Sequence, residues 1–254
     1  MNAKELYQRF EEAIPSSLRE SWDNDGIMCC ADGSSEIYRV LVALDVTEEI
    51  VDYAIERGFD LIVSHHPLIF KPIASLDEEN HISRKLIKLV CSGISVFSFH
   101  TRADKLFGGV NDRLADILGM KNTEPFGEGD LGRIGTIDEP MELQDFAYRV
   151  KQLCGSDIIR YADGYSDVHK VAIVGGDGKG YVKAAIDAGA DTYISGRIGY
   201  NVMEEAAEMG INLIEAGHYF TEQHICEFFR ELLIDFDPNL YIEISDSNMI
   251  RTIS

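Results

Sequence analysis

Two adjacent histidines, His65 and His66, stand at the point where an apolar run of the chain stops. Residues 61–63 are Leu, Ile and Val, which is typical of a buried strand, and Pro67 cannot continue the hydrogen-bonded ladder of a sheet. The carboxyl ends of strands are where α/β folds collect their functional groups. Two imidazoles at such an end predict a pair of ligands for a divalent transition metal ion.

Three further residues of ligand type, Asp104, His218 and Glu222, follow later segments that are also predicted to be strands. Imidazole and carboxylate ligands without thiolate suit zinc, iron, manganese and similar divalent ions. Five protein ligands are too many for one tetrahedral ion that keeps a position open, but they suit two ions roughly 3.5–4 Å apart that share a carboxylate. The set His65, His66, Asp104, His218 and Glu222 therefore predicts a dinuclear centre that activates a water.

Neighbouring polar residues are predicted to support these ligands. His100, after another predicted strand, is the candidate for acid–base catalysis or for orienting a metal-bound water, and a buried histidine that holds a backbone carbonyl is an equal alternative. Asp23, Asn24 and Asp45 either support the ligands from outside or fix loops. For these three residues the structural role is favoured.

Two other segments near the candidate ligands have predicted structural roles. The glycine-rich segment 175–180 lies between a predicted strand and a predicted helix, so its amides could bind an anion. It matches neither GxxxxGK[ST] nor GxGxxG, and a tight turn is the favoured interpretation. Thr221 is predicted to cap a helix that begins at Glu222.

The composition argues against several classes of function. The 254 residues carry 44 acidic and 23 basic side chains, for a formal net charge of −21. The bases are scattered, so the chain lacks the clustered basic face that binds a nucleic-acid backbone. No stretch reaches the ~20 apolar residues of a membrane span. We therefore expect partners other than nucleic acid or a membrane.

The N-terminal segment and the cysteines indicate a cytoplasmic protein. Leu6, Phe10 and Ile14 recur at the spacing of an amphipathic helix, and this segment lacks the apolar core of a signal peptide. The five cysteines are odd in number and none forms a CxxC pair. Such usage is typical of chains whose thiols stay reduced.

Strand-like and helix-like segments alternate along the chain, which predicts an α/β fold over mostly parallel sheets. Three of the predicted strands cover residues 39–43, 60–64 and 93–99. Between them, Thr47 is predicted to cap a helix that ends at Gly58, and a second helix covers 84–92. The second and third of these strands end next to candidate ligands.

The same unit recurs 131 residues further along the chain. Within 39–64, seven residues are identical to those 131 positions later without a gap, where chance would give roughly one or two. The third strand recurs at a shorter offset, since 92–97 resembles 209–214. Any two strand–helix–strand units share some features, but internal duplication is the better explanation of a gapless match.

The two copies differ where chemistry is predicted. Residues 64–66 are Ser-His-His in the first copy, whereas the equivalent 195–197 are Ser-Gly-Arg. The third strand of each copy leads to a histidine and an acid, namely His100 with Asp104, and His218 with Glu222. If the copies pack around a pseudo-twofold axis, these ends converge on one cleft with an asymmetric set of ligands, as in most catalytic centres.

Five segments carry a resemblance to a known family: Trp22-Asp-Asn-Asp-Gly26, Val42-Ala-Leu-Asp-Val-Thr47, Asp60-Leu-Ile-Val-Ser-His-His-Pro-Leu-Ile-Phe70, His100-Thr-Arg-Ala-Asp104 and Gly217-His-Tyr-Phe-Thr-Glu222. In this order, over essentially the whole chain, they resemble the NIF3-like family, whose bacterial members are often labelled GTP cyclohydrolase I type 2 homologues. The resemblance implies two divalent ions per chain (Zn, Fe or Mn), held by His65, His66, Asp104, His218 and Glu222. It also implies a ring-shaped homohexamer whose metal sites face an inner cavity.

The resemblance further implies two intertwined, duplicated α/β units with mixed, mostly parallel sheets. We expect residues 1–126 to form the first repeat and 127–254 the second, with the C-terminal segment packing back on the first. Longer relatives carry an inserted domain between the halves. This chain is too short for one and has only a connecting segment near 126–166 at that place.

Two functions remain open from the sequence. One is a metal-dependent hydrolase that acts on a phosphoester or a nucleotide, as the cyclohydrolase label would imply, and the other is a non-catalytic metal-handling or regulatory ring protein. Arg197 and Asn201 stand where relatives often have an acid and a histidine, and Arg102 stands where asparagine is common. The first two departures slightly favour the second function and leave the substrate undefined.

Overall fold

The computed structural model describes residues 1–253, which form two compact units. Unit 1 contains residues 1–103 and 225–249, and unit 2 contains residues 104–224 together with the segment that starts at Ile250. The chain therefore changes unit after 103 and after 224. The reason is that the last helix and strand of the chain pack on the sheet of unit 1.

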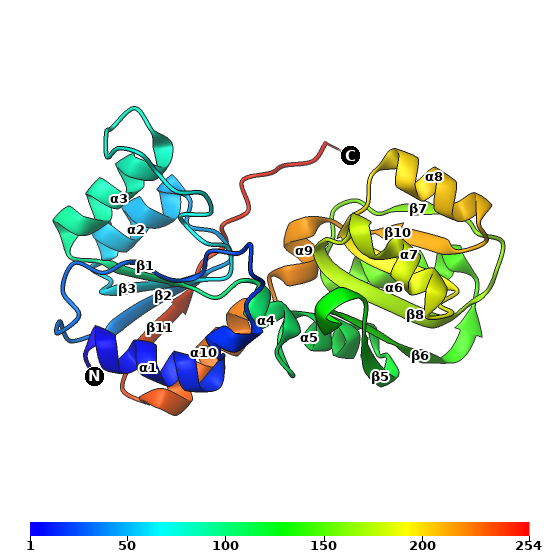
Figure 1. The fold of residues 1–254 in the computed structure, drawn as a ribbon, viewed down its shortest axis with the longest axis horizontal. Helices are drawn as coiled ribbons and strands as arrows, with labels where there is room; N and C mark the ends of the chain where they lie inside the picture. Colours follow the sequence, from blue (N-terminus) through cyan, green and yellow to red (C-terminus); the bar gives the residue numbers. More distant parts are fainter. Residues whose placement is uncertain (254) are drawn as a thin grey trace. The chain divides into compact units, whose positions relative to one another are not determined.

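The sheet of unit 1 has five strands in the order β1-β4-β3-β2-β11. Strands β2, β3, β4 and β11 are parallel, and β1 pairs antiparallel with β4. Helices α2 and α3 cover one face and helices α1 and α10 the other (Figure 1). The elements are α1 (Ala3–Ala13), η1 (Ser16–Leu18), β1 (Gly26–Cys29), β2 (Arg39–Ala43), α2 (Glu48–Arg57), β3 (Leu61–Ser64), α3 (His81–Ser92), β4 (Ser95–Ser98), α10 (Ile225–Phe236) and β11 (Tyr241–Ile244).

Local signals set the ends of these helices. The Thr47 hydroxyl accepts a hydrogen bond from the amide of Ile50 at the start of α2, and Gly58, with φ of 65°, ends that helix. Helix α3 begins three residues before the expected position 84. The carbonyl oxygen of the Asn80 side chain accepts hydrogen bonds from the amides of Ile82 and Ser83, which fixes the earlier start.

Both faces of this sheet are buried, as in most parallel sheets. Val96 of β4 belongs to the core beneath α2 and α3, whereas the next residue, Phe97, packs edge-on against Tyr7 of α1. On that second face Phe10 stacks on Phe99, and Phe99 contacts Phe229 of α10. The predicted amphipathic helix at the N-terminus is present, and its apolar side is fully buried.

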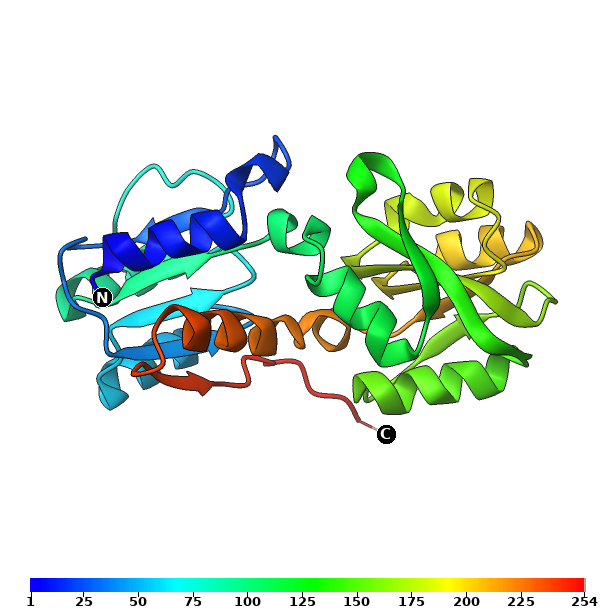
Figure 2. The ribbon, with the colours of Figure 1, turned by 90° about the horizontal axis from the view of Figure 1, so that it is seen from below.

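The sheet of unit 2 has six strands in the order β5-β6-β8-β9-β10-β7. Strands β8, β9 and β10 are parallel, and β5, β6 and β7 are antiparallel to their neighbours (Figure 2). The elements are α5 (Val110–Leu118), β5 (Lys121–Phe126), η2 (Glu128–Asp130), β6 (Gly132–Met141), α6 (Leu143–Cys154), β7 (Arg160–Ala162), β8 (Val168–Asp177), η3 (Lys179–Tyr181), α7 (Val182–Asp187), β9 (Thr192–Arg197), α8 (Tyr200–Glu208), β10 (Asn212–Glu215) and α9 (His218–Glu222). A further short helix, α4 (Thr101–Lys105), spans the change from unit 1 to unit 2.

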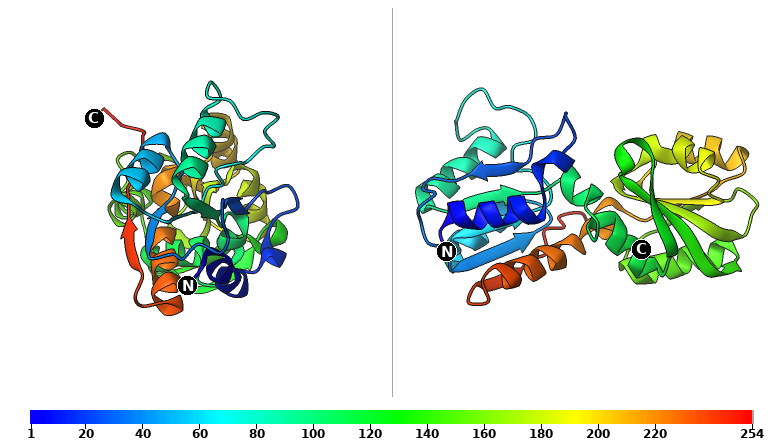
Figure 3. Two further views of the ribbon diagram at one scale, coloured as in Figure 1. Left: turned by 90° about the vertical axis from the view of Figure 1, so that its left-hand side faces the viewer. Right: turned by 60° about the horizontal axis from the view of Figure 1, so that its bottom comes forward.

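Helices also cover both faces of the second sheet, with α6 on one side and α7 and α8 on the other (Figure 3). Alternate residues of β8 enter the two cores. Val171 and Ile173 pack with α5 and α6, and Ala172 and Val174 pack with α7 and α8. The segment expected to be only a connection, near 126–166, contributes β6, α6 and β7 to this unit.

The internal duplication is visible in the register of the strands. Val40 of β2 pairs with Leu61 of β3, and the residues 131 positions later, Val171 and Thr192, pair in the same way in β8 and β9. The predicted α/β fold of duplicated units with mixed sheets is therefore confirmed. Among the described residues, no helix combines the length and apolarity needed to cross a membrane.

Candidate metal site

Unit 1 brings three imidazoles together at the carboxyl ends of neighbouring parallel strands. His65 and His66 follow β3, and His100 follows β4. One ring nitrogen from each histidine lies within 4.8 Å of the other two. The ring centroids are 5.0 Å apart for His65 and His66, 5.3 Å for His65 and His100, and 5.7 Å for His66 and His100. We call these three residues the imidazole cluster.

Each ring of the imidazole cluster is fixed at Nδ1 by an oxygen atom. The partner of His65 is the backbone carbonyl of Phe99 at 2.9 Å. The partner of His66 is Oδ1 of Asp45 at 2.7 Å, and that of His100 is Oδ1 of Asp23 at 2.8 Å.

A neutral imidazole that donates from Nδ1 carries its lone pair on Nε2, which is then the ligating atom. Oxygen partners of this kind are the usual outer support of metal-binding histidines. All three rings therefore fit a metal site. A contact with a backbone carbonyl, the alternative role considered for His100, is made by His65.

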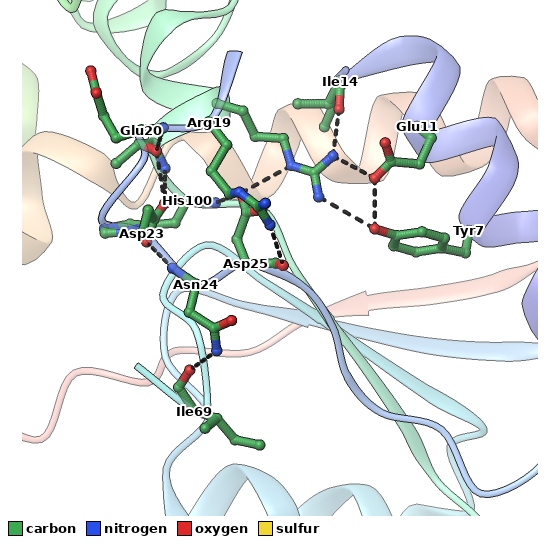
Figure 4. A network of polar contacts seen from close by, with 12 residues as sticks. Tyr7, Glu11, Ile14, Arg19, Glu20, Asp23, Asn24, Asp25, Ile69 and His100 are labelled. Atoms are coloured by element: carbon green, nitrogen blue, oxygen red, sulfur yellow. Dashed lines mark hydrogen bonds and ion pairs between the residues drawn. The ribbon is translucent and has the colours of Figure 1, made fainter. Parts of the chain in front are cut away.

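The loop that carries Asp23 fixes His100 through several hydrogen bonds (Figure 4). The second oxygen of the Asp23 carboxylate accepts hydrogen bonds from the amide and the hydroxyl of Thr101, at 3.1 and 2.7 Å. Burial would raise the pKa of Asp23, but the hydrogen bonds and charge of His100 and the hydrogen bonds of Thr101 hold it at about 2. Asp23 is therefore an anion that both supports His100 and fixes a loop. Asn24 has the favoured loop-fixing role, because Nδ2 of its side chain donates to the backbone carbonyl of Ile69.

Arg102, one of the three departures from the family pattern, is a fully buried anchor. Its Nε donates to Asp25 at 2.9 Å, and its Nη1 donates to Glu11 at 2.6 Å and to the carbonyl of Ile14 at 2.8 Å. The same Asp25 oxygen accepts the amide of His100 at 3.2 Å. Burial alone would lower the pKa of Arg102, but Glu11, Tyr7 and Asp25 raise it above its ordinary value. The guanidinium thus ties helix α1 to the segment that bears His100.

A cavity of about 330 Å³ lies beside His66 in unit 1. Asp45, Lys85 and His81 contribute polar groups to its wall, and Leu68 and Ile82 contribute apolar ones. Lys85 donates from Nζ to the carbonyl of Val46 at 2.6 Å, and burial lowers the pKa of this amine. The space next to the imidazole cluster has the size of a small molecule.

Unit 2 contains the other predicted ligands. Helix α9 follows β10, and Nε2 of His218 lies 3.0 Å from Oε2 of Glu222 one turn later. Glu222 and Asp104 are 4% and 8% exposed, and a carboxylate oxygen of one lies within 4.8 Å of one of the other. Two buried carboxylates so close repel each other, and a divalent cation would offset that repulsion. Glu222 therefore lies close to two other groups of ligand type, His218 and Asp104.

The glycine-rich segment 175–180 makes room for Glu222. A Cβ atom at Gly176 would collide with Oε1 of Glu222, and the φ of Gly176 is 65°. Three amides of the segment are bound by side chains, since Gly175, Gly176 and Gly178 donate to Asn111, Thr221 and Ser195. These amides are therefore used inside the unit, in agreement with the favoured tight turn and not with an anion site.

The second copy of the histidine-bearing strand end has a steric role. Gly196 stands where the first copy has His65, and a Cβ there would lie 2.6 Å from Oγ1 of Thr221 and 2.7 Å from Cα of His218.

The prediction that Thr221 caps a helix starting at Glu222 is wrong. Helix α9 begins at His218, so the Thr221 hydroxyl donates back to the carbonyls of Gly217 and His218. Arg197 and Asn201 are both exposed in the described structure.

The sequence and structure match a family of known proteins. Residues 1–252 match the family model described as Duf34/NIF3 (NGG1p interacting factor 3). Relatives named GTP cyclohydrolase 1 type 2 homolog are 32% identical over 230 residues in Clostridium acetobutylicum (87% of this chain, 85% of the relative) and 35% identical over 230 residues in Streptococcus pneumoniae (86% and 85%).

Two solved structures are similar over almost their whole length. A Staphylococcus aureus hypothetical protein has a TM-score of 0.89 and 29% identity, with 100% of this chain and 99% of that chain covered. Reduced HcgD from Methanocaldococcus jannaschii has a TM-score of 0.85 and 28% identity, with 96% and 97% covered. The likeness therefore extends over both units.

Proposed function

Because the chain belongs to the Duf34/NIF3 family, we propose that it is a metal-dependent hydrolase acting on a phosphoester or a nucleotide. The observation that carries this proposal is the imidazole cluster, in which an oxygen atom fixes Nδ1 of every ring. Purely structural histidines have no need to gather three ligating nitrogens within 4.8 Å. The small cavity beside His66 agrees with a substrate of low molecular weight.

In this proposal the five residues predicted from the sequence supply ligands for two divalent ions per chain. These residues are His65, His66, Asp104, His218 and Glu222. When bound, such ions polarise an ester oxygen and lower the pKa of a water to near neutrality. The Phe99 carbonyl and Asp45 hold the imidazoles of His65 and His66 in the ligating tautomer.

His100 is proposed as the residue that moves protons. Its Nδ1 is bound to the Asp23 carboxylate, so Nε2 is the atom that accepts a proton from a water or donates one to a leaving oxygen. Arg102 and Thr101 position this residue through Asp25 and Asp23. The alternative is that Nε2 of His100 is itself a ligand, since it belongs to the imidazole cluster.

A non-catalytic metal-handling or regulatory protein is the second candidate. Arg197 and Asn201 favour it, because an exposed cation and an amide stand where relatives often have an acid and a histidine. For either function we propose a homohexamer as the working assembly. We also propose a cytoplasmic location, since all five cysteines are free thiols.

The proposal is tested by metal content and turnover together. The purified protein is assayed for metal per chain and screened against phosphodiesters, nucleotides and GTP with Mn²⁺, Zn²⁺ or Fe²⁺ supplied. We expect two ions per chain and turnover that His66→Ala and Glu222→Ala abolish, while His169→Ala, at an exposed histidine of β8, retains both.

Two other results would contradict this assignment. Stoichiometric metal without turnover on any substrate class would favour the metal-handling function. If neither His66→Ala nor Glu222→Ala reduced the bound metal, the ligand assignment would be wrong. Light scattering that shows a monomer would refute the hexamer separately.

A further inference from the structure

Two large aromatic side chains lie exposed beside the imidazole cluster. Trp22 is 62% exposed and Phe70 is 46% exposed. Their ring centroids are 6.3 Å apart, and the centroid of His100 lies 6.4 Å from Trp22 and 6.1 Å from Phe70. Exposed aromatic rings gathered next to polar groups mark binding surfaces more often than accidental exposure does. We call Trp22 and Phe70 the aromatic pair.

The aromatic pair comes from two loops, one that carries His65 and His66 and one that supports His100 through Asp23. Trp22 directly precedes Asp23, whose carboxylate fixes His100. Phe70 lies in the loop that begins with His65 and His66, and the hydrogen bond from Asn24 to the carbonyl of Ile69 ties this loop to that of Trp22 (Figure 4). The chain therefore holds both rings in a defined position relative to His100.

The geometry of the three rings leaves aromatic surface available for stacking. The interplanar angles are 68° for Trp22 and Phe70, 80° for Trp22 and His100, and 86° for Phe70 and His100. The rings meet edge to face, so Trp22 and Phe70 do not cover each other by parallel stacking. A planar ring could stack on the exposed indole and lie close to the imidazole cluster.

We propose that the aromatic pair binds a planar heteroaromatic ring, of the nucleobase type, that belongs to the substrate. This inference rests on the proposed function and gives it a substrate class, since it selects a nucleotide over a simple phosphoester. Base–aromatic stacking tolerates different bases, because every base has a π face. The pair therefore confers a preference for molecules that carry a base, without selecting one base.

The experiment uses Trp22 as its own reporter, because it is the only tryptophan of the chain. The full-length protein with Zn²⁺ is titrated with AMP, GMP and ribose 5-phosphate, and the emission of Trp22 is recorded. Calorimetry gives Kd for the same three compounds independently of fluorescence. We expect AMP and GMP to quench the emission with saturation, and ribose 5-phosphate to bind at least about tenfold more weakly with little quenching.

Three variants separate stacking from simple burial. Phe70→Leu keeps an apolar side chain without a π face, and Trp22→Ala removes the larger ring. Both are expected to weaken AMP binding about tenfold and to leave the Kd of ribose 5-phosphate unchanged. Tyr38→Ala is the matched control, since Tyr38 is a 64% exposed aromatic residue of the same unit, and it should leave all three Kd values unchanged.

Two outcomes would overturn the inference. One is equal Kd values for AMP and ribose 5-phosphate in the wild type and in both variants. The other is a Trp22→Ala protein that binds AMP like the wild type but has a lower molecular mass by light scattering. The aromatic pair would then be a contact between copies of the chain. Hydrolysis of simple phosphoesters without base preference would refute this inference and support the proposed function. Base-selective binding without turnover would support this inference and contradict the proposed hydrolase activity.

Discussion

The imidazole of His66 is bound at Nδ1 by Oδ1 of Asp45 at 2.7 Å, and this one contact decides which nitrogen of His66 ligates a metal ion. A carboxylate only accepts hydrogen bonds, so Nδ1 carries the hydrogen of the neutral ring and Nε2 carries the lone pair. His66 is thus prepared for metal binding by a residue that sequence reasoning favoured as only structural.

We therefore expect Asp45→Asn to weaken Zn²⁺ binding about 10- to 100-fold. The amide that replaces the carboxylate can donate to Nδ1, which favours the tautomer with a hydrogen on Nε2. Competition with a chromophoric chelator measures the affinity. Asp52→Asn is the control, because Asp52 lies exposed on α2 and pairs with Lys88. Equal losses in the two variants would mean that general charge, and not the tautomer, controls affinity.

Gly176→Ala is expected to disturb the metal ligands of unit 2. Gly176 and Gly58 both have φ of 65°, so an alanine at either position costs about 1–2 kcal/mol from backbone strain. Only at Gly176 would the new Cβ also collide with Oε1 of Glu222, which adds roughly 1–3 kcal/mol. Nothing lies within 4 Å of the corresponding atom at Gly58.

Thermal unfolding and metal content of the two alanine variants test this difference. Gly58→Ala should lower Tm modestly and keep the metal of the wild type. Gly176→Ala should lower Tm further and bind less metal. If both variants bound metal like the wild type, the steric role assigned to Gly176 would be refuted.

Much of the site could be predicted because its residues mark strand ends. A run of apolar residues that stops at two histidines and Pro67 locates β3 and its functional end without a structure. The repeat at an offset of 131 likewise predicts the paired registers of Val40 with Leu61 and of Val171 with Thr192. The first signal is a local pattern and the second is an internal repeat, and a sequence displays both directly.

The rest of the site depends on contacts between distant segments. Tyr7 and Arg102 are 95 residues apart in the sequence. The residues around neither of them predict the hydrogen bond of 3.4 Å from the Arg102 guanidinium to the Tyr7 hydroxyl. The steric role of Gly196 depends on the position of Cα of His218, which only the packing of α9 on β9 sets. Thr221 was assigned to the wrong end of a helix because α9 is a single short turn that begins at His218.

Arg102→Met is expected to destabilise unit 1 by about 3–5 kcal/mol. The change leaves the fully buried side chain of Asp25 without its closest cation and removes the cation that pairs with Glu11. Unfolding by urea, followed by circular dichroism, measures the free energy. Arg19→Met is the matched control, because Arg19 is 41% exposed in its side chain and lies 3.6 Å from Asp25, so its loss costs less than about 1 kcal/mol. Similar values for both variants would contradict the anchoring role of Arg102.

The low pKa of Asp23 predicts how the metal-free protein responds to acid. The pKa falls from an ordinary 3.8 to about 2 on folding, so the folded state prefers the anion. The stabilisation is complete above pH 4, and it is lost progressively as the pH falls from about 4 to about 2, where the carboxylate takes up its proton. Protonation of either Asp23 oxygen also removes an acceptor, because Oδ1 accepts from His100 and Oδ2 accepts from Thr101.

We expect Asp23→Asn to be less stable than the wild type at pH 6 and to approach it between pH 4 and pH 2. Calorimetry without metal, at intervals over this pH range, gives the difference in Tm between the two proteins. This difference separates the contribution of Asp23 from that of the other carboxyl groups that titrate there. A difference in Tm that stays constant down to pH 2 would show that the Asp23 carboxylate gains no charge-dependent stability from His100 and Thr101. The expected loss of that difference would show that the charge on Asp23 is what holds the loop bearing Trp22 against the segment bearing His100.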